Sequence, residues 1–323
     1  MVYAGGLIPA QISQAEAQLD IALSQLGTVE ENVALRTRLA FYNVLLSQAL
    51  VSSAEQNLTA AQAQLAVANA RFEVGVAPRF DVLRAQTQVS QAQQTLTEAL
   101  NSVALAFTEL SRAMGVDQAS RYELVDPGQS PFPEENLEAL IEVAERGRSE
   151  LLAARAEVAA QRAGIRIARS ETRPQVSVTA TYQDSTEETG ITQGEGLVVL
   201  VGASIELFNG GRTRANVRRA RALTRSAEAN LEDTEQQVEQ DVREAYLELA
   251  TARQTIETAR TRLAQAQEAY DIAVIRYQAG VGTAVELADA LAQLTTARTN
   301  LDQSVYNYNI AYARLRRALG EVE

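Results

Sequence analysis

The sequence repeats itself at an offset of 205 residues. Residues 5–115 align with residues 210–320 without a gap. Within this alignment, Arg-Phe-Glu-Val-Gly-Val at residues 71–76 corresponds to Arg-Tyr-Gln-Ala-Gly-Val at residues 276–281. Glycine and aromatic positions stay in step, which chance similarity between two Ala-rich segments does not explain, so the sequence indicates an internal two-fold repeat.

Each half of the repeat predicts a long antiparallel helical hairpin, the first over residues 7–115 and the second over residues 210–320. Apolar residues recur at helical spacing, and the first tract continues for roughly 65 residues, or ~100 Å of helix at 1.5 Å per residue. Turns are expected where Gly75 and Gly280 interrupt the tracts. The predicted fold class is therefore mainly α with a small β part.

The remaining segments predict the connections between the hairpins. Residues 116–133 contain three prolines and predict a linker. Residues 134–172 predict one further long helix, and residues 173–209 predict two strands joined by a polar, acidic loop. By the repeat, residues 1–6 correspond to the end of a further strand. We therefore expect that a signal peptide and the first strands are missing before Met1.

The predicted strands alternate between apolar and polar residues. Val176, Val178 and Ala180 fall on one face of the first strand, and residues 197–201 are apolar throughout. Both strands have the length of a tilted strand that spans a membrane, and alternation of this kind is typical of such strands. From these residues alone, a soluble β-hairpin fits equally well.

The composition excludes much of enzyme chemistry. The chain contains no Cys, no His and no Lys, and its net charge is −12. Thiolate or imidazole metal sites, an imidazole base and a Schiff-base lysine are therefore excluded. We predict no enzyme activity and no catalytic, cofactor-binding or metal-binding residues. The acidic balance also argues against nucleic acid as a partner.

Four segments together resemble a known family. They are Ala-Arg-Phe-Glu-Val-Gly-Val-Ala-Pro-Arg-Phe-Asp-Val-Leu at residues 70–83, Ile-Arg-Tyr-Gln-Ala-Gly-Val-Gly-Thr at 275–283, Phe-Asn-Gly-Gly-Arg at 208–212 and Tyr-Asn-Tyr-Asn-Ile-Ala-Tyr-Ala-Arg-Leu at 306–315. In combination they are similar to those of the TolC-like outer-membrane efflux proteins, also called outer membrane factors. The similarity extends over the whole chain and includes both hairpin turns.

The resemblance implies a homotrimer in the cell outer membrane. Its protomers would share one transmembrane β-barrel in outer-membrane lipid and one α-helical tunnel (an α-barrel) through the periplasm. The implied function is a passive exit duct of a tripartite efflux or type I secretion system. The implied partners are a periplasmic adaptor (membrane fusion) protein and an inner-membrane pump or ABC transporter. Family resemblance does not predict the exported substrate.

The resemblance also implies roles for residues at the two hairpin turns. Glu286 and Asp289 would form an acidic ring at the tunnel entrance, although Thr283 and Glu286 also fit a helix capping box. Asp81 and Tyr277 would form a latch between the hairpins. The adaptor would contact the tips at Val74, Gly75, Val76, Ala279, Gly280 and Val281.

One position departs from the family pattern. Gly282 stands where the family's best-known member has an arginine that joins the latch. The latch is therefore expected to be weaker, or Arg79 or Arg84 would substitute for the missing guanidinium.

Two alternatives remain open from the sequence. The chain could be a soluble periplasmic coiled-coil scaffold with an incidental β-hairpin, or a non-functional truncated homologue. A scaffold of this kind would show sustained strict heptads, which the sequence does not contain, so the duct is the favoured interpretation.

Overall fold

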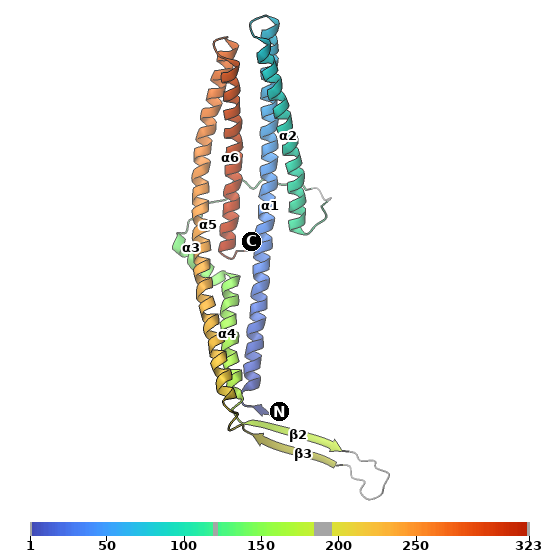
Figure 1. Ribbon diagram of the computed structural model, residues 1–323, viewed down its shortest axis with the longest axis vertical. Helices are drawn as coiled ribbons and strands as arrows, with labels where there is room; N and C mark the ends of the chain where they lie inside the picture. The colour runs from blue at the N-terminus through green and yellow to red at the C-terminus, as the bar shows by residue number, and fades with distance from the viewer. Residues whose placement is uncertain (1, 119–121, 184–195, 322–323) are drawn as a thin grey trace, which may run out of the picture. The chain divides into compact units, whose positions relative to one another are not determined.

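The computed structural model describes residues 2–118, 122–183 and 196–321, and most of these residues are helical (Figure 1). The predicted loop at residues 184–195 lies outside the described residues. The elements in chain order are β1 (Tyr3–Ala4), α1 (Leu7–Glu73), α2 (Arg79–Met114), α3 (Leu137–Gly147), α4 (Ser149–Ser170), β2 (Gln175–Gln183), β3 (Gly196–Ser204), α5 (Arg212–Gln278) and α6 (Ala284–Ala318).

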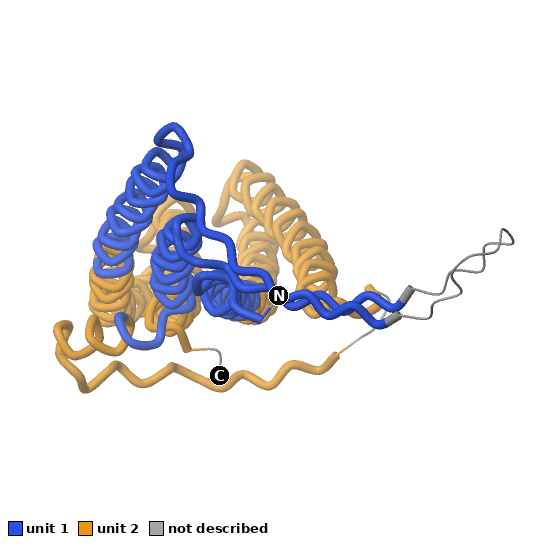
Figure 2. Tube along the Cα trace, turned by 90° about the horizontal axis from the view of Figure 1, so that it is seen from below, with its two compact units in different colours: residues 1–29, 145–239 blue, residues 30–144, 240–323 orange. Residues whose placement is uncertain are grey.

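The chain divides into two compact units, coloured separately in Figure 2. Unit 1 comprises residues 1–29 and 145–239, and unit 2 comprises residues 30–144 and 240–323. Helices α1 and α5 contribute to both units, because each of them is 67 residues long. Unit 1 contains the sheet, whereas unit 2 contains both hairpin turns and the linker.

The two hairpin turns have corresponding backbone geometry. The amide of Gly75 donates to the carbonyl of Phe72 at 2.9 Å, and the amide of Gly280 donates to the carbonyl of Tyr277 at 3.1 Å. The two glycines have φ angles of 78° and 80°, in the left-handed region where a Cβ atom is disfavoured. Equivalent positions in the two halves therefore make the same kind of turn.

Small side chains dominate the interior between the helices. In unit 2, Ala40, Val44 and Leu110 form one buried cluster, against which Phe41 and Phe107 pack. Alanine lets neighbouring helices approach closely at low entropic cost. Among the described helices, none combines the length and the apolar composition that crossing a lipid bilayer would require.

The helix predicted over residues 134–172 is two helices in the structure, α3 and α4. Arg148 separates them with an extended backbone (φ −64°, ψ 120°). Its side chain is buried, and its Nε donates to Glu150 at 2.9 Å. The next residue, Ser149, lies very close to Gly27 of α1. A Cβ added to Gly27 would be only 2.6 Å from the Oγ of Ser149. The prediction was wrong at this point because tertiary contacts, which periodicity does not report, favour the break.

The sheet of unit 1 has the order β1-β2-β3 and is antiparallel. Gln175 lies opposite Ser204, and Tyr3 lies opposite Val176. Opposed residues of an antiparallel pair share a face. One face of β2 and β3 therefore carries only apolar side chains, those of Val176, Val178, Ala180, Tyr182, Leu197, Val199, Val201 and Ala203.

Candidate functional site

The turns of the two hairpins are linked by Arg71 of α1. Its guanidinium lies over the ring of Tyr277, with 4.6 Å between Cζ and the ring centroid. Its Nη1 also donates to the backbone carbonyl of Tyr277 at the end of α5. Arg71 therefore fastens one turn to the other through a cation–π contact and a charge-assisted hydrogen bond. The sequence placed Arg71 in the repeat and in a segment that resembles the family, but did not predict its contact with Tyr277.

Tyr277 is buried in the second turn, with 3% of its surface exposed. Its ring packs in a cluster with Ala284 and Leu287. Within the described part of the chain, its hydroxyl has no hydrogen-bond partner. Burial raises the pKa of this phenol, the negative charge of Asp81 raises the pKa further, and Arg71 lowers it.

Asp81 and Tyr277, the two residues expected to form the latch, make no hydrogen bond to each other. The two residues are close enough to interact electrostatically, but the hydroxyl does not reach a partner. The ring of Tyr277 packs in the cluster with Ala284 and Leu287, and its hydroxyl is buried without a partner among the described residues. The arginine that accompanies Tyr277 is Arg71, rather than Arg79 or Arg84.

The two acidic residues after the second turn differ in their surroundings. Glu286 completes a capping box with Thr283, whose Oγ1 accepts from the Glu286 amide at 3.1 Å. A carboxylate oxygen of Glu286 also lies 3.8 Å from the Arg276 guanidinium. Asp289 is exposed and makes no hydrogen bond or ion pair with any described residue. Both carboxylates are exposed, but that of Glu286 has contacts within its own turn and that of Asp289 has none with a described residue.

The predicted adaptor-contact residues are all exposed at the turns: Val74, Gly75, Val76, Ala279, Gly280 and Val281. Exposed valines at the ends of otherwise well-packed hairpins leave apolar surface in water. Phe80 adds a large exposed apolar side chain beside the first turn.

The linker is anchored to α6 by residues whose contacts the sequence did not predict. Tyr306 donates its hydroxyl to Asp126 at 2.9 Å. Asn309 is buried, donates to the carbonyl of Gly128 and accepts from the amide of Ser130, both at 2.9 Å. Burial and the bond to Asp126 raise the pKa of Tyr306 to about 12. The motif at residues 306–315 was visible in the sequence, but the contacts of its Tyr and Asn side chains were not.

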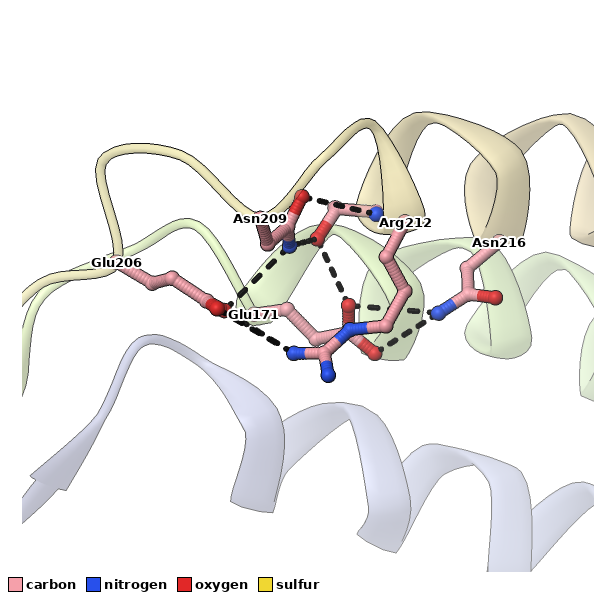
Figure 3. A network of polar contacts seen from close by, with 6 residues as sticks. Glu171, Glu206, Asn209, Arg212 and Asn216 are labelled. Atoms are coloured by element: carbon pink, nitrogen blue, oxygen red, sulfur yellow. Dashed lines mark hydrogen bonds and ion pairs between the residues drawn. The ribbon is translucent and has the colours of Figure 1, made fainter.

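A polar network joins the end of α4 and the segment after β3 to the start of α5 in unit 1 (Figure 3). The Glu171 carboxylate accepts from Thr213 at 2.8 Å and from Asn216 at 3.2 Å. Glu206 pairs with Arg212 at 3.2 Å and accepts from Asn209. β3 ends at Ser204, which lies opposite Gln175, the first residue of β2, so this strand is shorter than the segment up to residue 209 that the sequence predicted.

The described residues offer few ligands for a metal ion. Across residues 2–118, 122–183 and 196–321, no three carboxylates gather as a metal ion would require, and the sequence has no His or Cys. The features described instead are long packed helices, exposed turns and a sheet with one apolar face.

Comparison with known proteins decides the family. The sequence profile described as "Outer membrane efflux protein" matches residues 2–116 and 140–321. The chain belongs to the outer membrane efflux protein family. No curated protein sequence matches the chain.

Several solved structures share the fold of this family member. A membrane protein from Pseudomonas aeruginosa is 25% identical, with a TM-score of 0.85 over 98% of this chain and 74% of that chain. The outer membrane protein VceC from Vibrio cholerae is 19% identical, with a TM-score of 0.84 over 99% of this chain and 77% of that chain. The open state of the MtrE outer membrane channel from Neisseria gonorrhoeae is 18% identical, with a TM-score of 0.82 over 98% and 72%.

Proposed function

We propose that this family member is an outer-membrane channel that serves as the exit duct of a tripartite efflux or type I secretion system. Three copies would share one β-barrel and one helical tunnel, through which substrates delivered by an inner-membrane pump pass without chemical change. The observation that carries the proposal is the apolar face of the β2–β3 sheet.

This apolar face is exposed rather than packed against a helix. Tyr182, Leu197, Val199 and Val201 each expose more than half of their surface. On the opposite face of β2, the side chains include Ser177, Thr179 and Thr181. A sheet with one apolar and one more polar face suits lipid outside and water inside. A soluble scaffold would have no reason to leave seven of the eight apolar residues of this face exposed.

The edges of the sheet support an assembly of several copies. Among the described residues, β3 has a strand partner only on its β2 side, and β1 covers only two residues of β2. Unpaired backbone groups are not tolerated in lipid, because no water is present to bond them. Strands of neighbouring copies would satisfy these edges, and a homotrimer is the arrangement that the family resemblance implies.

The turns are the proposed contact surface for a periplasmic adaptor protein. The exposed residues Val74, Val76 and Val281 would bury their apolar surface against its tip. Asp289, with Glu286 beside it, would line the entrance of the tunnel. The latch would consist of Tyr277, Asp81 and Arg71, with Arg71 making the direct contacts between the hairpins.

A vesicle-flotation experiment tests whether the sheet lies in lipid. The double variant Val199→Asp/Val201→Asp places two carboxylates on the apolar face, and Thr179→Asp/Thr181→Asp places the same charge on the opposite face. We expect only the first variant to lose co-flotation with phospholipid vesicles, because a charge facing lipid costs several kcal/mol. Equal flotation of all three proteins, or none by the parent protein, would contradict the proposal and favour the scaffold.

A further inference from the structure

We infer that the junction between the sheet and α5 binds an anionic phospholipid, with the headgroup phosphate held by arginines of α4 and α5. The inference rests on the proposed function in one respect, namely that β2 and β3 lie in the membrane. The site is a pocket of about 630 Å³ in unit 1, within the usual size range of small-ligand sites.

The pocket is strongly basic in a chain whose net charge is −12. Arg169 of α4 lines it together with Arg214, Arg218 and Arg221 of α5, and none of its lining residues is acidic. The three α5 arginines share one helix face, because their spacing is four and then three residues. None of the four arginines forms an ion pair with a described residue.

The packing of α4 against α5 explains why these arginines have no ion-pair partner among the described residues. Glu228 of α5 pairs with Arg162 of α4 at 2.8 Å. Seven residues later in α5 and seven residues earlier in α4, Glu235 lies 3.8 Å from Arg155. Seven residues in the other direction, the same register places Arg221 opposite Arg169. The row of ion pairs between α4 and α5 is therefore followed by a position that holds the guanidinium groups of Arg169 and Arg221 and no carboxylate. Two like charges at one such position favour a bound anion.

The nearest carboxylates are already engaged. Glu171 accepts hydrogen bonds from Thr213 and Asn216, and Glu206 pairs with Arg212 (Figure 3). Neither glutamate lines the pocket. Asn209 and Thr213 also line the pocket, but their side-chain donors already bond Glu206 and Glu171, so the arginines are the donors that remain for a phosphate.

Apolar side chains in the same pocket favour a lipid over a free anion. Leu207 and Phe208 line it, and 88% and 87% of their surfaces are exposed. They follow directly after β3, which ends at Ser204, and precede α5, which begins at Arg212. With the sheet in the membrane, this segment lies at the level of the phospholipid headgroups. Arginine clusters at that level bind anionic headgroups, while neighbouring apolar residues contact acyl chains.

Titration of the detergent-solubilised protein by isothermal calorimetry tests the inference. The probes are dioctanoyl phosphatidylglycerol, dioctanoyl phosphatidylcholine and inorganic phosphate. We expect saturable binding of the phosphatidylglycerol, with affinity at least about tenfold above that of either other probe, because only it combines net negative charge with acyl chains. If inorganic phosphate bound as tightly as the lipid, the pocket would be an anion site without preference for lipid, and the inference would be overturned.

A matched pair of variants distinguishes a built site from diffuse positive charge. Arg218→Gln/Arg221→Gln removes two pocket arginines, whereas Arg219→Gln/Arg225→Gln removes the same charge from exposed positions of α5 that do not line the pocket. We expect the first variant to weaken phosphatidylglycerol binding roughly tenfold or more, and the second to change it less than about threefold. Equal losses in both variants, or no saturable binding by the parent protein, would overturn the inference.

Two further readouts separate the remaining outcomes. A change of oligomeric state in Arg218→Gln/Arg221→Gln, with phosphatidylglycerol binding retained, would assign the pocket to a neighbouring copy and overturn the lipid site. Flotation of the parent protein is measured on the same preparation. Flotation without saturable lipid binding contradicts only this inference, and lipid binding without flotation contradicts only the proposed function.

Discussion

The two hairpin turns share a backbone but differ in what their side chains do. Gly75 and Gly280 have nearly the same φ angle and make corresponding hydrogen bonds. Yet Tyr277 has 3% of its surface exposed, whereas Phe72, its equivalent in the first half, has 44% exposed. The arginines that precede these aromatic residues diverge in the same way.

Arg71 reaches across to the second turn, while Arg276 stays within its own. Arg71 covers the ring of Tyr277 and donates to its carbonyl. Arg276 lies 3.8 Å from Glu286, and both side chains are about half exposed. One turn is therefore fastened by a contact between hairpins and the other by a local, solvated ion pair. A repeated sequence thus supplies the same turn twice, and differences in packing give the two copies different roles.

Substitution of Arg71 and Arg276 should give the largest difference in the free energy of unfolding between the two turns. Arg71→Ala removes a charge-assisted hydrogen bond and a cation–π contact, and should lower the free energy of unfolding by about 2 kcal/mol. Arg276→Ala removes an exposed ion pair with Glu286 and a long, exposed hydrogen bond to the Val281 carbonyl, and should cost at most about 0.5 kcal/mol. Urea denaturation of both variants measures the difference, and equal losses would show that the turns are fastened alike.

Alanine at the turn glycines should have an intermediate effect. Gly75→Ala and Gly280→Ala both force a Cβ into the left-handed region, at a cost of about 1 kcal/mol each. A Cβ at Gly75 would meet no atom within 4 Å, and one at Gly280 would lie 3.8 Å from Arg71 Nη2, an ordinary contact. Thermal denaturation should therefore give similar losses for both. A clearly larger loss in one variant would mean that the two backbones are less alike than their hydrogen bonds indicate.

Removal of the Tyr277 hydroxyl should have the smallest effect at neutral pH. Because this hydroxyl has no partner among the described residues, Tyr277→Phe should change the free energy of unfolding by less than about 0.5 kcal/mol. The raised pKa of Tyr277 keeps the folded phenol protonated after the unfolded phenol begins to ionise near the ordinary tyrosine pKa of 10.0. The stability contribution is complete below that pH and is lost as pH rises through the folded pKa.

Urea titrations at neutral pH and above pH 10 measure this dependence. The alkaline loss of stability should be shallower in Tyr277→Phe than in the parent protein. Tyr306→Phe is the control, because its hydroxyl donates to Asp126 and its loss should already cost about 1 kcal/mol at neutral pH. Comparable losses in the two variants at neutral pH would indicate that Tyr277 has a partner after all.

Sequence reasoning succeeded where structure depends on near neighbours. The long helices, the left-handed glycine at position 115 and the capping box at Thr283 and Glu286 all lie where the residues predict them. The alternation of Val176, Val178 and Ala180 likewise identified the apolar face of β2. In each case the signal comes from residues within a few positions of one another.

The same reasoning missed features that depend on distant segments. The break at Arg148 follows from its burial and from the approach of Gly27 to Ser149. The contact of Arg71 with Tyr277 joins residues more than two hundred positions apart. The burial of Tyr277, whose hydroxyl has no partner among the described residues, likewise depends on packing against residues outside its own motif.

The sequence by itself therefore determined the repeated hairpins, their glycine turns and a strand pair with one apolar face. Periodicity and turn chemistry are local, and they act in the same way wherever a segment is placed. Only the tertiary structure decided that Arg71 binds the opposite turn and that Arg221 lies in register with Arg169. Both depend on how far one helix is shifted along another, and the many small side chains between the helices allow more than one such register.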